Sequence, residues 1–212
     1  MVVETPVAEL HFEHYGAGMP IVILHGLFGS ARNWRSVAHK LAADFRVIAV
    51  DLRNHGSSPH LPDMSYTALS IDVSALLEKL DLDDVTLIGH SMGGKAAMTL
   101  SLAEPERIAR LVVVDIGPGS YDNEFDNILT AMSDLDIRTI TRRAEASDRL
   151  KQAIPDNDIR LFILQNLNLS TGRSLSWRIN LPAIRAEIAH LVGAIPRDRG
   201  SSFDGTTYFI RG

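Results

Sequence analysis

The sequence predicts an α/β fold, in which a doubly wound and mostly parallel sheet carries a helical cap insertion. Short runs that are apolar at every position alternate with helical patterns through the first half of the chain. Such runs are typical of parallel strands, because helices cover both faces of a parallel sheet. After Gly117-Pro118-Gly119 the chain becomes charge-rich, with apolar residues spaced near the helical period, and a strand-like run returns only at 206–210.

The elements follow from these patterns in chain order. Residues 8–15 alternate apolar and polar side chains, which indicates a half-exposed antiparallel edge strand. Buried strands are expected at 21–24, 45–50, 85–88 and 111–114, and helices at 34–43, at 66–80 and from 94 onward. Strands and helices that alternate in this way predict βαβ units. The region 122–191 predicts several helices, and 196–205 predicts a polar loop.

Three segments are therefore expected. Residues 1–117 form the N-terminal part of the core, residues 118–195 form a helical cap, and residues 196–212 return to the core. We interpret the run at 206–210 as the penultimate strand of the sheet, so that a C-terminal strand and helix are expected to be missing.

Composition restricts the function. The chain has 212 residues, of which 45% are hydrophobic and 22% charged, with a formal net charge of −5. This charge gives no reason to expect nucleic acid or an anionic membrane as a partner. The absence of cysteine excludes disulfides, thiolate catalysis and cysteine-bound zinc. No targeting segment and no bilayer-spanning run is visible, so we predict a cytoplasmic protein without membrane insertion and make no prediction of oligomeric state.

The segment Gly89-His90-Ser91-Met92-Gly93 matches G-x-S-x-G between a predicted strand and a predicted helix. This pattern forms a nucleophile elbow, a sharp turn that projects the serine hydroxyl away from the backbone and requires small flanking residues. We therefore predict Ser91 as a nucleophile and the backbone N–H of Met92 as one donor to an oxyanion. The alternative is that Ser91 only caps the helix.

The same stretch also fits most of a P-loop, G-x-x-x-x-G-K-[ST], from Gly89 to Lys95. The residue that follows is Ala96, which has no hydroxyl group to bind Mg²⁺. We therefore favour the elbow over a nucleotide site.

A second motif, His25-Gly26-Leu27-Phe28-Gly29-Ser30, directly follows the predicted strand 21–24. An oxyanion hole needs a second backbone N–H from the loop at this place, and we predict Leu27 as that donor. We interpret His25 as a structural residue, because the general base follows the acid in chain order in this class of enzyme.

Two aspartates end predicted strands. Asp51 begins a loop with Arg53 and His55, for which we predict a turn held by side-chain to backbone hydrogen bonds. Asp115 ends the strand 111–114, and functional residues of open α/β sheets gather at the carboxyl ends of strands. Asp115 is therefore the predicted catalytic acid, and the alternative is a turn aspartate ahead of Gly117.

These motifs, with Trp177-Arg178-Ile179-Asn180-Leu181-Pro182 in the expected cap, resemble the YbfF-like bacterial esterases of the α/β-hydrolase superfamily and the mitochondrial hydrolases similar to them. The resemblance covers essentially the whole chain. It implies an α/β-hydrolase fold that cleaves small-molecule carboxylic esters, and thioesters such as acyl-CoA, through an acyl-serine intermediate. It implies no cofactor and no metal. The family's acid can stand where Asp115 stands, and the usual superfamily position falls just beyond Gly212.

The chain departs from this family at the catalytic histidine, which lies near the family's C-terminus. No histidine follows His190, which falls in the expected cap. We therefore expect the 212 residues to be an N-terminal portion of a longer protein, nearly inactive alone, since loss of one triad member leaves only residual catalysis. The alternative is a non-catalytic α/β-hydrolase homologue that binds a small molecule or a protein partner. Among enzymes, a C–C hydrolase or a perhydrolase would use the same triad.

Overall fold

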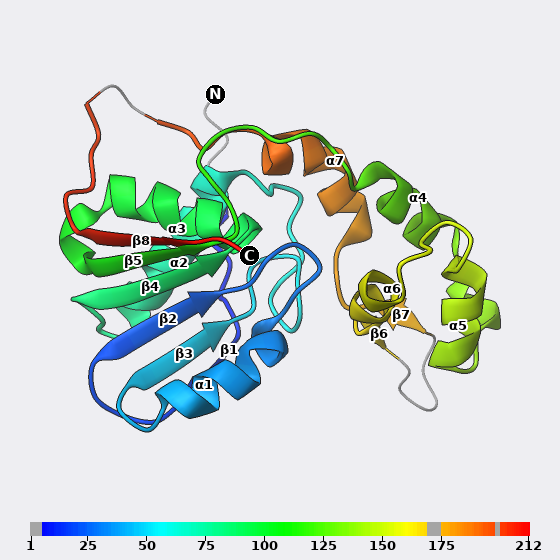
Figure 1. Cartoon of the computed structure of the whole chain (residues 1–212), viewed down its shortest axis with the longest axis horizontal. Coiled ribbons are helices and arrows are strands. Elements are labelled where there is room, and N and C mark those ends of the chain that lie inside the picture. The colour runs from blue at the N-terminus through cyan, green and yellow to red at the C-terminus, as the bar shows by residue number, and fades with distance from the viewer. Residues whose placement is uncertain (1–5, 169–174, 198–199) are drawn as a thin grey trace.

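A computed structural model describes residues 6–168, 175–197 and 200–212 of the chain. Its six-stranded sheet has the order β1-β3-β2-β4-β5-β8 (Figure 1). The strands are β1 Phe12–Tyr15, β2 Pro20–Leu24, β3 Arg46–Val50, β4 Val85–His90, β5 Ile108–Val114 and β8 Thr206–Ile210. Only β1 runs antiparallel to its neighbour within this sheet. The α/β class, the antiparallel edge strand and the late return to the sheet are confirmed.

Helices cover both faces of the sheet because its central strands are apolar at every position. In β2, Ile21 and Ile23 pack with Ala38 of α1, whereas Val22 and Leu24 belong to the main core with Leu69 of α2. The helices of this part are α1 Arg35–Leu41, α2 Tyr66–Lys79 and α3 Met92–Ala103, with short 3₁₀ turns η1 Ala31–Trp34 and η2 Pro105–Arg107. Successive residues of the strand therefore point to opposite faces of the sheet, and each face is covered by a different helix layer.

The predicted cap is largely helical and lies beyond the carboxyl ends of the parallel strands (Figure 1). Its elements are α4 Asp126–Asp134, η3 Ile137–Thr139, α5 Arg143–Leu150, α6 Asn157–Leu164, β6 Leu167–Asn168, β7 Ser176–Trp177 and α7 Leu181–Val192. The antiparallel pair β6–β7 was not predicted, because two residues per strand are too few to show a period. We keep the name cap for residues 118–195, and those boundaries stay a prediction.

Hydrogen bonds attach the cap to loops of the core. Tyr66 of α2 donates its hydroxyl to the carbonyl of Leu191 at 2.6 Å. The side chain of Asn166 donates to the carbonyl of Phe28 at 2.8 Å. These bonds hold the cap over the edge of the sheet where functional residues gather. No helix within the described ranges has both the length and the apolar character needed to cross a lipid bilayer.

Candidate active site

Ser91 is the single residue between β4 and α3, and its backbone is strained. Its φ is 50° and its ψ is −118°, a conformation that residues other than glycine rarely adopt. Its side chain makes no capping hydrogen bond to α3. The predicted sharp strand-to-helix turn is therefore present, and the structure does not support a capping role for the Ser91 hydroxyl.

Glycines on either side of Ser91 allow this turn. A Cβ atom added at Gly89 would lie 2.3 Å from the carbonyl oxygen of Gly93, and one added at Gly93 would lie 2.5 Å from that of Leu24. Both distances are too short for any side chain. The turn is therefore packed directly against the end of β2.

The loop after β2 approaches the same point. A Cβ atom added at Gly26 would lie only 3.1 Å from the Cβ of Ser91. Leu27, Ser91 and Met92 line one cavity of about 290 Å³. Within the part of the chain that the structure describes, the amides of Leu27 and Met92 have no hydrogen-bond acceptor. Leu27 and Met92 therefore lie beside Ser91 in one cavity, and their role as oxyanion donors stays a prediction.

The rest of this cavity is mainly apolar and comes from both core and cap. Its other lining residues are Tyr66, Lys95, Ile116, Tyr121, Asp122, Glu124, Phe125, Leu191 and Val192. The cap therefore closes one side of the space in front of Ser91. An apolar wall of this kind favours the hydrocarbon part of a ligand.

Lys95 is a site residue that the sequence interpretation missed. It is only 1% exposed, and its Nζ donates to the carbonyls of Val192, at 3.4 Å, and Gly193. Its ammonium also lies 4.9 Å from the ring centre of Tyr121, and burial lowers its pKa. The sequence places Lys95 four residues after Ser91 at the start of a helix, and this spacing could have indicated that both residues lie on the same side of that helix.

Asp115 lies beside the nucleophile elbow at the end of the neighbouring strand. The amide of Ser91 donates to the carbonyl of Val114 at 3.0 Å, and the amide of Asp115 donates to Ile210 at 2.7 Å. Asp115 lines an adjoining hollow of about 460 Å³, which shares Ile116 and Tyr121 with the Ser91 cavity. Its catalytic role stays a prediction.

Two buried histidines are structural, as predicted for His25. The Nδ1 of His25 lies 2.8 Å from the carbonyl of Gly26, and its Nε2 accepts from the amide of Leu52 at 3.0 Å. His55 likewise accepts from the amide of Phe28 at 3.2 Å. Burial lowers the pKa of His25 to about 4 and that of His55 to about 3, so both rings are neutral near pH 7.

No histidine contacts the space in front of Ser91. All eight histidines of the chain lie in the described ranges, and none lines the cavity that contains Ser91. Burial lowers the pKa of His90, the histidine next to Ser91 in sequence, although the Asp115 carboxylate opposes this shift. Among the residues with described positions, no group of three or more histidine and carboxylate side chains could hold a metal ion.

The predicted turn after β3 is confirmed, with one addition. Asp51 accepts from the amides of Ala31 at 2.7 Å and Ser57 at 2.9 Å. Arg53 donates to backbone carbonyls, but it also forms an ion pair with Asp72 at 2.6 and 2.7 Å, fully shielded from solvent. The sequence pattern gave no signal for this ion pair.

Comparisons with known proteins gave matches to a family model, to related sequences and to solved structures. A family model described as the alpha/beta hydrolase fold matches residues 19–179. The chain is 39% identical, over 95% of its length and 65% of the relative's, to the sn-1-specific diacylglycerol lipase ABHD11 of Danio rerio. It is 37% identical to the esterase YbfF of Escherichia coli (strain K12), over 82% of this chain and 67% of that protein. A solved structure named marine microorganism esterase superposes with a TM-score of 0.93 at 35% identity, covering 97% of this chain and 81% of the other. The chain thus spans about 65% of the first relative's length.

Proposed function

Because the chain belongs to the α/β-hydrolase fold family, we propose that it is a serine hydrolase that cleaves carboxylic esters through an acyl-serine intermediate on Ser91. One observation carries this proposal. The strained Ser91 lines a single cavity with Leu27 and Met92, whose amides have no acceptor among the described residues.

The proposed reaction has two acyl-transfer steps. The Oγ of Ser91 attacks the ester carbonyl while an imidazole takes its proton, and the amides of Leu27 and Met92 hold the oxyanion. The C–O bond to the alcohol then breaks, and the imidazole returns the proton to the departing alcohol. Water attacks the acyl-serine in the same way and releases the acid. Asp115 orients the imidazole and stabilises its charge.

The identity of the relatives supports esters as the substrate class. One is named a diacylglycerol lipase and the other an esterase. The apolar side chains of the cavity suit an acyl chain, and Ile116 and Phe125 belong to this wall. Thioesters such as acyl-CoA are a further proposed substrate, because attack at their carbonyl uses the same nucleophile and the same oxyanion donors.

The imidazole is the group that none of the lining residues provides. We therefore expect the 212-residue chain by itself to hydrolyse esters at a residual rate only. The hollow beside Asp115 shares the lining residues Ile116 and Tyr121 with the Ser91 cavity, and we expect free imidazole to reach both side chains.

Chemical rescue tests the mechanism directly. We expect added imidazole to accelerate p-nitrophenyl acetate turnover by the chain beyond the rate of imidazole in solution, and to leave an acetyl group on the peptide that contains Ser91. Ser91→Ala should remove this enzyme-dependent rate, and Asp115→Asn should reduce it. Ser36→Ala, an exposed change on α1, is the matched control. Equal imidazole-dependent rates for the unmodified chain and Ser91→Ala would exclude Ser91 as the nucleophile.

The lack of a histidine in this cavity also favours a second candidate function, a non-catalytic homologue that binds a small molecule. That function predicts that a neutral ester binds the chain, as measured by calorimetry, and that no acyl-enzyme forms at any imidazole concentration. Detection of the acetylated Ser91 peptide would eliminate it.

A further inference from the structure

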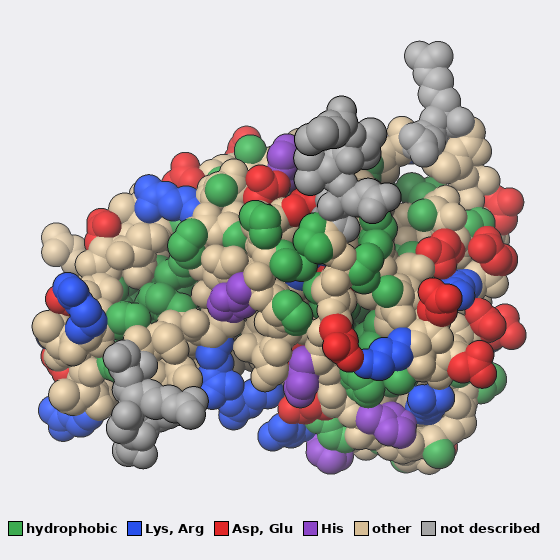
Figure 2. All heavy atoms as spheres, turned by 180° about the vertical axis from the view of Figure 1, so that it is seen from behind, with side chains coloured by type: hydrophobic (Ala, Val, Ile, Leu, Met, Phe, Trp, Pro, Cys, Tyr) green, Lys and Arg blue, Asp and Glu red, His purple; other side chains and the backbone are tan. Residues whose placement is uncertain are grey.

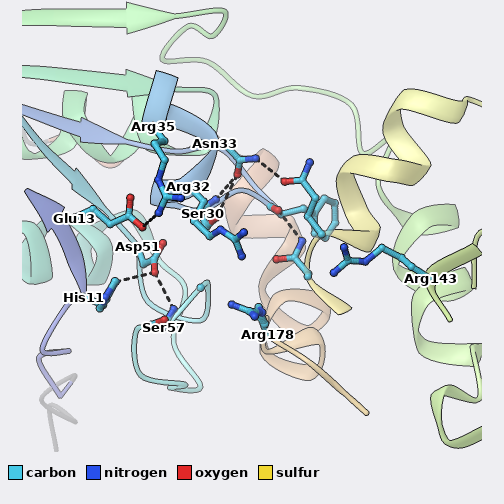
Figure 3. Close-up of a pocket in the computed structure, with 14 residues that line it drawn as sticks. His11, Glu13, Ser30, Arg32, Asn33, Arg35, Asp51, Ser57, Arg143 and Arg178 are labelled. Atoms are coloured by element: carbon cyan, nitrogen blue, oxygen red, sulfur yellow. Dashed lines mark hydrogen bonds and ion pairs between the residues drawn. The ribbon is translucent and has the colours of Figure 1, made fainter. Parts of the chain in front are cut away.

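A third hollow lies where the cap meets the core, on the other side of the loop after β2. It has a volume of about 260 Å³ and is lined by core residues such as Ser30 and by cap residues such as Arg143 (Figure 3). Asn33 on the core donates to the side chain of Gln165 at 2.8 Å. We call this hollow the arginine cleft, because Arg32, Arg35, Arg143 and Arg178 all line it.

The acidic side chains of the arginine cleft already have other hydrogen-bond or ion-pair partners. Glu13 is paired with Arg35 at 2.7 Å. Asp51 accepts hydrogen bonds from two backbone amides and lies 3.0 Å from the Nδ1 of His11. Neither carboxylate is therefore free to balance the remaining arginines.

The other three arginines have no carboxylate partner within the described ranges. Among the described residues, Arg143 donates to the backbone carbonyl of Leu167, at 3.1 Å. The Nε of Arg178 is completely buried and has no hydrogen-bond acceptor among the described residues. A buried donor on a cation that lacks an acceptor is costly, so an anion beside this guanidinium group would be stabilised.

The three unpaired arginines come from different parts of the fold. Arg32 lies in η1, Arg143 begins α5 and Arg178 follows β7. Figure 3 shows the guanidinium group of Arg143 reaching from the cap toward Arg32 on the core. On the face seen in Figure 2, Lys and Arg side chains also gather between the core and the cap.

We propose that the arginine cleft is a second binding site, which takes a phosphate-bearing ligand. Guanidinium groups match phosphate oxygens with paired hydrogen bonds. A phosphate monoester carries a charge of about −1.5 to −2 at pH 7, so it balances several cations where one carboxylate cannot. Asn33, Gln165 and Ser30 supply neutral hydrogen-bonding groups around the same space.

The arginine cleft is separate from the Ser91 cavity but adjoins it. The two share no lining residue. Phe28 lines the cleft, and its ring packs edge-on against Phe125 of the Ser91 cavity with a centroid distance of 6.0 Å. The phosphate can therefore belong either to an ester substrate that also reaches Ser91 or to a free anion.

Calorimetric titration with inorganic pyrophosphate tests the site without any need for ester hydrolysis. We expect Ser91→Ala to bind pyrophosphate as the unmodified chain does. Arg32→Ala should weaken binding by about tenfold or more, because a hydrogen bond between charged groups is lost. Arg32 is exposed, and no hydrogen bond or ion pair joins its side chain to another described residue, so this variant should fold. Arg178→Ala is the second variant, and raising the salt concentration should weaken binding.

Arg185→Ala is the matched control, since Arg185 is an exposed arginine of α7 outside the cleft. An equal loss of affinity in Arg185→Ala and Arg32→Ala would overturn the proposal, as would unchanged affinity in both Arg32→Ala and Arg178→Ala.

Two further titrations of Ser91→Ala distinguish the sources of phosphate. If the phosphate is part of a substrate, dihexanoyl phosphatidic acid should bind more tightly than both pyrophosphate and dihexanoylglycerol, and Arg32→Ala should remove that preference. If it is a free anion, pyrophosphate should bind at least as tightly as the phosphatidic acid. Binding of neither phosphate compound would refute the site, whatever the esterase assay shows.

Discussion

Replacement of Ser91 by glycine should stabilise the fold at the expense of the nucleophile. The backbone at this position has φ 50° and ψ −118°, which glycine adopts without strain and alanine does not. The side chain makes no capping bond to α3, so its removal costs no helix cap. Ser91→Gly and Ser91→Ala therefore differ mainly in backbone strain.

The expected difference follows from two opposing terms. Strain of this kind costs roughly 1–3 kcal/mol. Glycine loses more conformational freedom on folding, which costs roughly 0.5–1 kcal/mol relative to alanine. Ser91→Gly should therefore be more stable than Ser91→Ala by up to roughly 2.5 kcal/mol, which raises the melting temperature by up to roughly 10 °C in a chain of this size.

Urea unfolding followed by circular dichroism measures this difference. Ala186 in α7 is the control, because it is exposed in an ordinary helix. There a change from alanine to glycine should destabilise the fold by about 1 kcal/mol, so the sign of the effect reverses between the two positions. If Ser91→Ala is at least as stable as Ser91→Gly, the elbow is not strained and the geometric basis of the proposed mechanism is wrong.

Three further predictions concern the surroundings of the site. Arg53→Met leaves the wholly buried carboxylate of Asp72 without its ion-pair partner. This change should lower the free energy of unfolding, measured in urea, by about 3–5 kcal/mol, and a loss under about 1 kcal/mol would contradict the prediction. Because burial lowers the pKa of His25 to about 4 and of His55 to about 3, the unfolded chain takes up protons first as the pH falls below about 6.5. The free energy of unfolding should therefore decrease by about 2 kcal/mol per histidine between about pH 7 and pH 5, and a flat profile would count against buried neutral rings. Gly93→Ala places a Cβ 2.5 Å from a carbonyl oxygen of β2 and so displaces the loop that carries Leu27. This change should reduce imidazole-rescued turnover about a hundredfold. Gly119→Ala adds a Cβ with no atom within 4 Å and should leave the turnover unchanged.

Much of the fold could be predicted because its signals are local. Strands apolar at every position, such as the run 21–24, predicted a sheet covered on both faces. In the structure, alternate residues of β2 pack against α1 and α2. The pair β6–β7 could not be predicted, because its strands of two residues are fixed by their contacts in the cap and carry no period of their own.

The candidate active site, too, could be predicted only in part from the sequence. The elbow at Ser91 is defined by glycines within two residues of it, so its backbone conformation could be predicted from five letters of sequence. The position of Asp115 followed from strand order. Lys95 was missed, because its burial against the carbonyls at the end of α7 depends on where the cap lies.

The sequence by itself therefore determined the sheet, the cap as a helical region and the strained turn at Ser91. Backbone preferences depend on neighbours along the chain, and those neighbours are visible in the sequence. Only the tertiary structure decided that Arg32, Arg143 and Arg178 share one cleft and that no histidine lines the Ser91 cavity. Both facts depend on how residues far apart in the sequence pack together, and a local pattern does not specify that packing.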